Sequence, residues 1–419
     1  MARSHLTLAA LATSAVADLQ VRGSGAHTAG GEGNYDAARL VTADGRELIV
    51  RIPTSQQAET EQSADLIALR ALTPGIRSRL PFDAPTVVGQ LPVDGTRAVV
   101  LDFVAGSHLD PTALGRDEVL SDSLGAAVAA IHSLPTAFIA EAGLPLLSTE
   151  LIRADAHRIV SRAAETRLLP TAVRERWQAA VEDHSLWQFQ PTVIHGSLAA
   201  DRVLVIRQDG HGLVNGVIEW GSLRVGDPAL DLHWIATLGA TGEQALSAYA
   251  ASCSRGPDRF VTLRARLYAE LEIARWLLHG RDSHDETIVE DAVAMLDGLV
   301  DRVLGDVTDP LGTTTGPVLD VDEVEDMLDR TPIGSSSPGI AMQTDTYDRS
   351  ELERALGRDP GGSDDDDTDD GETDDVRDHA GTDADANATD QIDTSSFELW
   401  DSAASPKDRS HSDRSSSSE

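Results

Sequence analysis

The sequence predicts a two-lobed α+β fold, in which a small antiparallel sheet precedes a mostly helical region. Strand-like runs at residues 36–42 and 47–52 are joined by a turn containing Asp44-Gly45, which is typical of a hairpin. After residue 116, several long stretches carry apolar side chains at helical spacing. From Asp306 onward the chain has 32 acidic and 8 basic residues, against 38 and 26 before it. We therefore expect a folded body followed by an acidic tail.

Three regions follow from this division. We expect residues 1–105 to form the sheet-containing N-lobe and residues 106–305 to form the helical C-lobe. A body of about 300 residues can bury a full core. Residues 306–419 are rich in Asp, Ser, Gly and Pro, and such a segment buries too little apolar surface to offset its ordering entropy. We expect the tail to be disordered.

The elements are predicted in chain order. Leu6 to Val16 has the spacing of a helix packed on the body, although Ala15-Val16-Ala17 also resembles a signal-peptide cleavage site. The strand at 98–106 ends in a segment that reads either as an inter-lobe hinge or as an ordinary turn. The remaining elements are a helix at 56–72, short strands bounded by 81–85 and 92–95, a helix at 116–132, one or two helices within 146–184, and helices at 242–252, 257–280 and 285–304.

Composition limits the partners and the compartment. The net charge of −36 disfavours binding to nucleic acid or to an anionic membrane, because both would repel the chain. The one cysteine, Cys253, fits a reducing compartment such as the cytoplasm and excludes a cysteine metal site. The one lysine, Lys407, lies in the tail, so arginine supplies the cationic chemistry of the body.

Three blocks carry the functional signal. They are His195-Gly196-Ser197 with Arg202 five residues later, Ile218-Glu219-Trp220, and Gly226-Asp227-Pro228 with Asp231-Leu232. Together they resemble the aminoglycoside and macrolide phosphotransferases, which share the protein-kinase fold. In that family the first block reads His-Gly-Asp followed by Asn or His, and the second reads Ile-Asp-Trp. The third block is intact here.

The resemblance implies a nucleotide-dependent activity. Members of this family transfer the terminal phosphate of ATP or GTP, with Mg²⁺, to a hydroxyl on a small molecule such as a macrolide or an aminoglycoside. A glycine-rich turn at 30–33 resembles the loop that covers the nucleotide phosphates. By the same resemblance, Arg51 takes the place of the phosphate-binding lysine, and Asp65 is its acidic helix partner, with Glu61 as the alternative.

The reactive positions depart from the family pattern. Ser197 stands at the position of the general base, and a serine hydroxyl is not ionised at neutral pH. Arg202 stands at the metal-binding amide, and a guanidinium has no lone pair for a metal. Glu219 stands at the second metal position and keeps the charge on a longer side chain. Arg202 could contact phosphates directly, and Asp201 is a substitute base.

Other residues of these blocks are predicted to be structural. His195 is expected to hold the loop by hydrogen bonding, and Asp227 and Asp231 to cap a helix and brace the loop. Trp220 is expected to pack under the site, and His132 to be a packed or capping residue.

Two functions from different classes fit these features. The first is a slow phosphotransferase acting on a small hydroxylated molecule, with its acceptor selected by the region 146–184. The second is a pseudokinase that binds a nucleotide or metabolite, or docks a partner, without turnover. The acidic tail is either a solvated segment or a site for a basic protein partner, since Phe397-Glu398-Leu399-Trp400 adds aromatic residues to acidic surroundings.

Overall fold

The computed structural model describes residues 3–27, 33–254 and 256–305. The chain divides into two units, residues 1–315 and 316–419, and only the first contains described residues. The predictions for the acidic tail and for most of the glycine-rich turn at 30–33 therefore lie outside the described residues.

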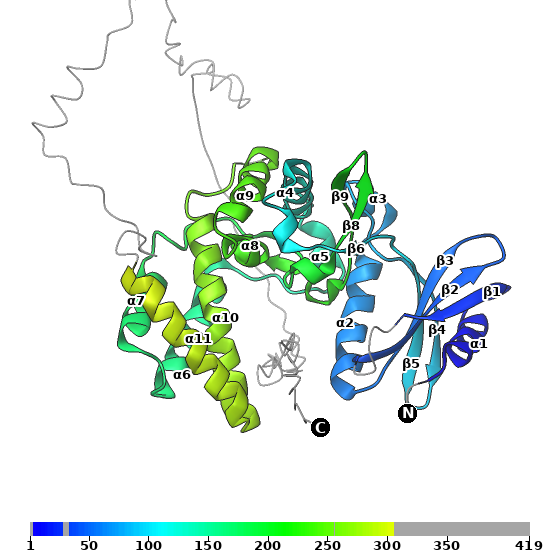
Figure 1. Cartoon of the computed structure of the whole chain (residues 1–419), viewed down its shortest axis with the longest axis horizontal. Coiled ribbons are helices and arrows are strands. Elements are labelled where there is room, and N and C mark those ends of the chain that lie inside the picture. The colour runs from blue at the N-terminus through cyan, green and yellow to red at the C-terminus, as the bar shows by residue number, and fades with distance from the viewer. Residues whose placement is uncertain (1–2, 28–32, 255, 306–419) are drawn as a thin grey trace, which may run out of the picture. The chain divides into compact units, whose positions relative to one another are not determined.

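Five antiparallel strands form the N-terminal sheet in the order β1-β2-β3-β5-β4 (Figure 1). Their bounds are β1 Val21–Ala26, β2 Tyr35–Thr42, β3 Glu47–Pro53, β4 Val87–Val93 and β5 Thr96–Asp102. The predicted hairpin is confirmed, because β2 and β3 pair directly and set Ala37 opposite Arg51. Gly45 has a φ of +86° in the turn between them, a conformation that glycine adopts without strain.

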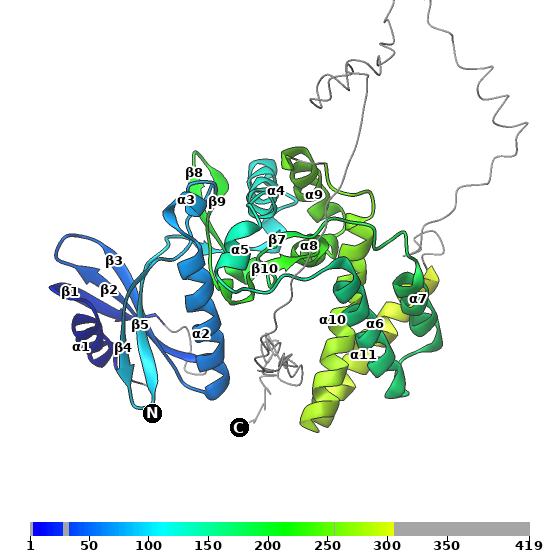
Figure 2. The same cartoon turned by 180° about the vertical axis from the view of Figure 1, so that it is seen from behind.

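Two helices cover the two faces of this sheet, as both views of the chain show (Figures 1 and 2). Alternation along β3 sends Leu48, Val50 and Ile52 to one face, where Leu8 and Ala12 of α1 (His5–Ala15) pack on them. The helix predicted at residues 6–16 is thus confirmed. The other face, which carries Arg51, is covered by α2 (Gln56–Ala71).

The C-lobe is mostly helical, as predicted, and contains two small sheets. Its strands are β6 Ser107–His108, β7 Thr192–Ile194, β8 Val203–Gln208, β9 His211–Val217 and β10 Arg224–Gly226. Its α-helices are α4 Glu118–His132, α5 Ala137–Glu141, α6 Thr149–Glu165, α7 Thr171–Glu182, α8 Ala229–Ala236, α9 Ala240–Ser252, α10 Val261–Ser283 and α11 Glu286–Gly305, and a short α3 Pro74–Arg77 precedes β4. The sequence did not predict α3 or α5, because each is too short to show a repeating apolar pattern.

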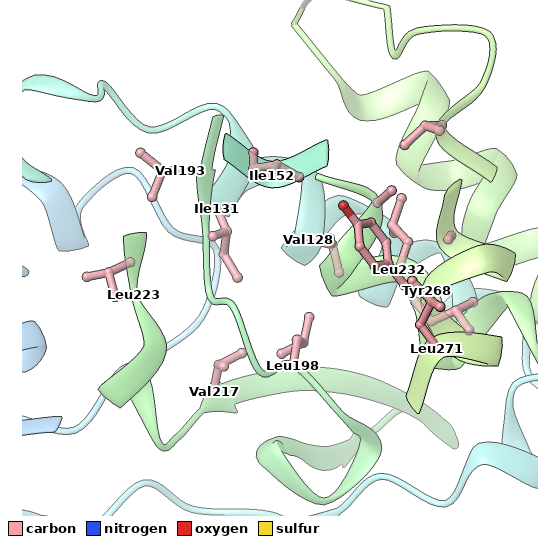
Figure 3. Close-up of a cluster of buried hydrophobic side chains, with 14 of the residues drawn as sticks. Val128, Ile131, Ile152, Val193, Leu198, Val217, Leu223, Leu232, Tyr268 and Leu271 are labelled. Carbon is pink, nitrogen blue, oxygen red and sulfur yellow. The ribbon is translucent and has the colours of Figure 1, made fainter. Parts of the chain in front are cut away.

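A continuous apolar core lies beneath the loop that follows β7 (Figure 3). Val128 and Ile131 of α4, Leu232 of α8 and Leu271 of α10 belong to it, and Leu198 joins it from the loop itself. Because Leu198 is 1% exposed, the loop is fixed to the core directly after Ser197. Within the described residues, no helix is long and apolar enough to span a bilayer.

Candidate active site

The loop that carries Ser197 is held by one buried carboxylate. Asp231, near the start of α8, accepts the backbone N–H of His195 at 2.7 Å and that of Gly196 at 2.8 Å. Burial opposes its ionisation, but the hydrogen bonds that it accepts from His132 and from the Gly196 N–H favour the charged form, and the pKa of Asp231 is lowered. Asp231 therefore braces the loop and does not face a ligand, since it is fully buried.

Gly196 is required at the bend of this loop. Its φ is +85°, and a Cβ atom added there would lie 2.3 Å from the carbonyl oxygen of Ser222. Real Cβ atoms do not approach backbone so closely, so any other residue would separate the two segments. The bend sets Ser197 next to the segment that follows Glu219.

His195 has a structural place. It is fully buried, its ring lies 4.9 Å from that of Trp220, and its Nε2 donates to the carbonyl oxygen of Ile218 at 3.1 Å. That carbonyl can only accept, so the proton of the neutral ring is on Nε2. Burial lowers the pKa of His195, which keeps the ring neutral and in this tautomer.

Arg51 of β3 and Asp65 of α2 form an ion pair, with 2.5 Å between Nη2 and Oδ2. Their side chains are 15% and 7% exposed. Burial opposes the charge on Arg51, but Asp65 and then Tyr35 outweigh burial and raise its pKa. The structure therefore pairs Arg51 with Asp65 and not with the alternative, Glu61. The Nε of Arg51 is buried and has no hydrogen-bond partner among the described residues.

Asp65 also reaches the segment after Glu219. Its Oδ1 accepts the backbone N–H of Trp220 at 2.8 Å. Gly221 allows this approach, because a Cβ atom there would lie 3.3 Å from the backbone nitrogen of Asp65. One carboxylate thus joins β3, α2 and the short 3-10 helix η3 (Trp220–Ser222).

Arg202 connects the loop of Ser197 with the segment of Glu219. Its Nε donates to Oε2 of Glu219 at 2.8 Å, and its Nη1 donates to the carbonyl oxygen of Ser197. The Arg202 side chain is 16% exposed, whereas that of Glu219 is 54% exposed. Glu219 has a φ of +64°, a left-handed conformation that costs a non-glycine residue about 1–2 kcal/mol. The ion pair with Arg202 is the contact that fixes its side chain among the described residues.

Glu61 completes the charged group. Burial raises the pKa of Glu61, and the negative charge of Glu219 raises it further. Arg51 and Arg202 act on Glu61 in the opposite direction. Arg51, Arg202 and Glu219 therefore all lie close enough to Glu61 to change its pKa by their charges.

Asp201 is the remaining candidate base. It is exposed on the 3-10 helix η2 (Ala200–Arg202), and its carbonyl oxygen accepts a hydrogen bond from Nδ1 of His108. Its carboxylate makes no hydrogen bond or ion pair with the described residues, so nothing in that part of the chain fixes it against Ser197.

Asp227 connects the start of α8 with α10 through its carboxylate. Its Oδ1 accepts the N–H of Ala229 at 2.9 Å, which caps the start of α8. Arg264 of α10 pairs with the same carboxylate at 2.7 Å, and the Tyr268 hydroxyl donates to it at 3.0 Å. Sequence reasoning missed Arg264, which is fully buried, because its spacing on α10 does not differ from that of solvent-facing arginines.

The residues present do not fit a magnesium ion. Mg²⁺ requires near-octahedral oxygen ligands, usually including one or two carboxylates. Glu219 is paired with Arg202, and the carbonyl of Ser197 accepts from the same guanidinium. Among the described residues, no group of three His, Cys, Asp or Glu side chains is placed to hold a metal. Arg51, whose buried Nε–H has no acceptor among the described residues, carries a guanidinium, the group that commonly pairs with phosphate oxygens in proteins.

Comparison with known proteins identifies the family. Residues 28–277 match the model of the phosphotransferase enzyme family, so the chain belongs to that family. Its fold is that of the macrolide and aminoglycoside phosphotransferases, which is protein-kinase-like. The fold class expected from the sequence is thus confirmed.

Three solved structures illustrate the likeness. Macrolide 2'-phosphotransferase MphH from Brachybacterium faecium has a TM-score of 0.57 and 22% identity, over 70% of this chain and 98% of that one. Macrolide 2'-phosphotransferase type I has a TM-score of 0.55 and 23% identity, over 70% and 95%. The GDP complex of aminoglycoside 2'-phosphotransferase-IIIa has a TM-score of 0.55 and 19% identity, over 71% and 98%.

A relative of unknown activity also matches. The uncharacterized protein YcbJ of Bacillus subtilis strain 168 is 24% identical over 195 residues, which is 45% of this chain. The match spans 61% of the length of YcbJ.

Proposed function

We propose that this chain binds a nucleoside phosphate, ATP or GTP, beside Arg51 and transfers its phosphoryl group poorly or not at all. The observation that carries this proposal is the ion pair between Arg202 and Glu219, which occupies both metal-binding positions of the family next to Ser197. Loss of a general base alone costs about 10²–10⁴ in rate, or roughly 3–5.5 kcal/mol of barrier.

Binding is supported by the state of Arg51. The Arg51–Asp65 ion pair fixes the guanidinium in place, and the Nε–H of Arg51 has no acceptor among the described residues. A preformed guanidinium of this kind suits a phosphate oxygen. An aminoglycoside 2'-phosphotransferase with the same fold has been solved with GDP, which agrees with a nucleotide as the ligand.

The experiment separates binding from turnover. We expect ATP or GTP to raise the melting temperature of the full chain, because a ligand that binds the native state stabilises it. We expect no phosphate transfer to a panel of hydroxylated small molecules. Efficient transfer by the wild-type chain would contradict the proposal, and so would the absence of any nucleotide-dependent stabilisation.

A slow phosphotransferase is the second candidate. It is favoured by the hydrogen bond from Trp220 to Asp65, which holds the segment after Glu219 against α2, the helix that also carries the ion-pair partner of Arg51. Asp201 would then serve as the base, and a small hydroxylated molecule near α6 and α7 would be the acceptor. Measurable transfer by the wild-type chain that is lost in Asp201→Asn would favour this candidate.

A further inference from the structure

We infer that Arg202 takes the place of a divalent cation, so that this site binds a polyphosphate anion without metal. The inference rests on the proposed function, and it concerns how the ligand is held. It starts from the position of Arg202, whose guanidinium joins the Ser197 carbonyl on one loop to the Glu219 carboxylate on the other. A bridging metal ion would connect the same two loops through oxygen ligands.

The net charge of the site supports the replacement of a divalent cation by Arg202. Relative to the family pattern, Ser197 removes one negative charge, Arg202 adds one positive charge, and Glu219 changes nothing. The site thus gains two units of positive charge, which is the charge of one Mg²⁺ ion. Unlike the metal, this charge is attached to the chain, since a guanidinium stays protonated at any relevant pH.

The geometry leaves Arg202 able to act on an anion. Its Nε donates to the Glu219 carboxylate at 2.8 Å, and a phosphate oxygen can accept from a guanidinium as a carboxylate oxygen does. Glu219 is more than half exposed, so its carboxylate can yield to a phosphate oxygen at little desolvation cost. Arg51 presents a second guanidinium on the same charged group.

Substitution of Glu219 tests the inference, because a metal-binding role and a role as competitor for Arg202 predict opposite changes in nucleotide affinity. If Glu219 ligates a metal, Glu219→Gln weakens nucleotide binding. If Glu219 only competes with the phosphate for Arg202, Glu219→Gln strengthens binding. Its exposure makes the change compatible with folding.

The test is calorimetric titration of the full chain with ATP and with inorganic tripolyphosphate, in EDTA and in excess Mg²⁺. We expect dissociation constants in the two buffers to agree within about threefold, since the cation is built into the chain. In EDTA, Arg202→Asn should weaken binding by about tenfold or more, and Glu219→Gln should strengthen it severalfold. Arg207→Asn, which removes an exposed arginine of β8, should change nothing.

The outcomes are distinguishable. Binding that appears only with Mg²⁺, or that Glu219→Gln weakens in EDTA, would overturn the inference and leave the proposed function standing. Absence of binding in both buffers would overturn both. If Arg202→Asn unfolds, as its circular dichroism would show, the Glu219→Gln titration decides.

Discussion

Asp65 and Trp220 are 155 positions apart, and the carboxylate of Asp65 accepts the backbone N–H of Trp220 at 2.8 Å. The second oxygen of the same carboxylate holds Arg51. Arg51 of β3 and the segment after Glu219 therefore share one partner. Loss of the Asp65 carboxylate would remove both contacts.

Asp65→Asn tests this shared contact. The change leaves Arg51 buried without its counter-ion, and removal of one partner of a buried ion pair costs about 3–5 kcal/mol. We expect a loss near the lower end, about 3 kcal/mol, because Arg51 is 15% exposed. Urea unfolding followed by circular dichroism measures it. Glu61→Gln, on the same helix, is the control and should cost less than about 1 kcal/mol, since Glu61 has no ion pair among the described residues.

Gly196→Ala tests the bend before Ser197. We expect a loss of about 2–4 kcal/mol, from left-handed backbone strain and from the clash with the Ser222 carbonyl. Gly45→Ala is a matched control, because Gly45 has nearly the same φ, +86°, and open space around its Cβ position. It should cost about 1 kcal/mol. Equal losses of stability at the two positions would show that the backbone at Ser222 moves away from the added Cβ atom at little cost.

The pH dependence of stability follows from His195. Burial lowers the pKa of His195 in the folded state, so below pH 6.5 the unfolded chain takes up a proton that the folded chain does not. Stability contributed by the neutral ring is therefore present above pH 6.5 and is lost as pH falls toward the folded pKa. In His195→Asn, the slope of unfolding free energy against pH in this window should decrease by up to about 1.4 kcal/mol per pH unit. An unchanged slope would mean that His195 titrates normally.

Asp201→Asn separates the two candidate functions. Asp201 is exposed and its carboxylate makes no hydrogen bond or ion pair with the described residues, so we expect unchanged stability and unchanged nucleotide affinity. We also expect no change in any slow transfer measured over long incubation. A tenfold or larger drop in transfer would identify Asp201 as the base.

Local features of the fold could be predicted from the sequence, and the decisive contacts of the site could not. The Asp44-Gly45 turn and the alternation in β3 identify the hairpin that carries Arg51. The spacing of the three site blocks identifies the loop of Ser197. The pairing of Arg202 with Glu219, by contrast, depends on two loops meeting through tertiary structure, and no pattern within either loop indicates it. Arg264 of α10 could not be predicted either, because its spacing on the helix is that of a solvent-facing arginine although it pairs with the buried Asp227.

The central claim is tested most directly by measuring ATP binding in a variant that restores the family residues at the three positions. The variant Ser197→Asp/Arg202→Asn/Glu219→Asp removes the built-in charge and supplies oxygen ligands for Mg²⁺. We predict that ATP binding becomes dependent on Mg²⁺ in this variant and stays independent of it in the wild-type chain. We also predict that phosphate release with Mg²⁺ rises by about 10²-fold or more. If wild-type binding already requires Mg²⁺, or if the variant binds equally well in EDTA, the account is contradicted.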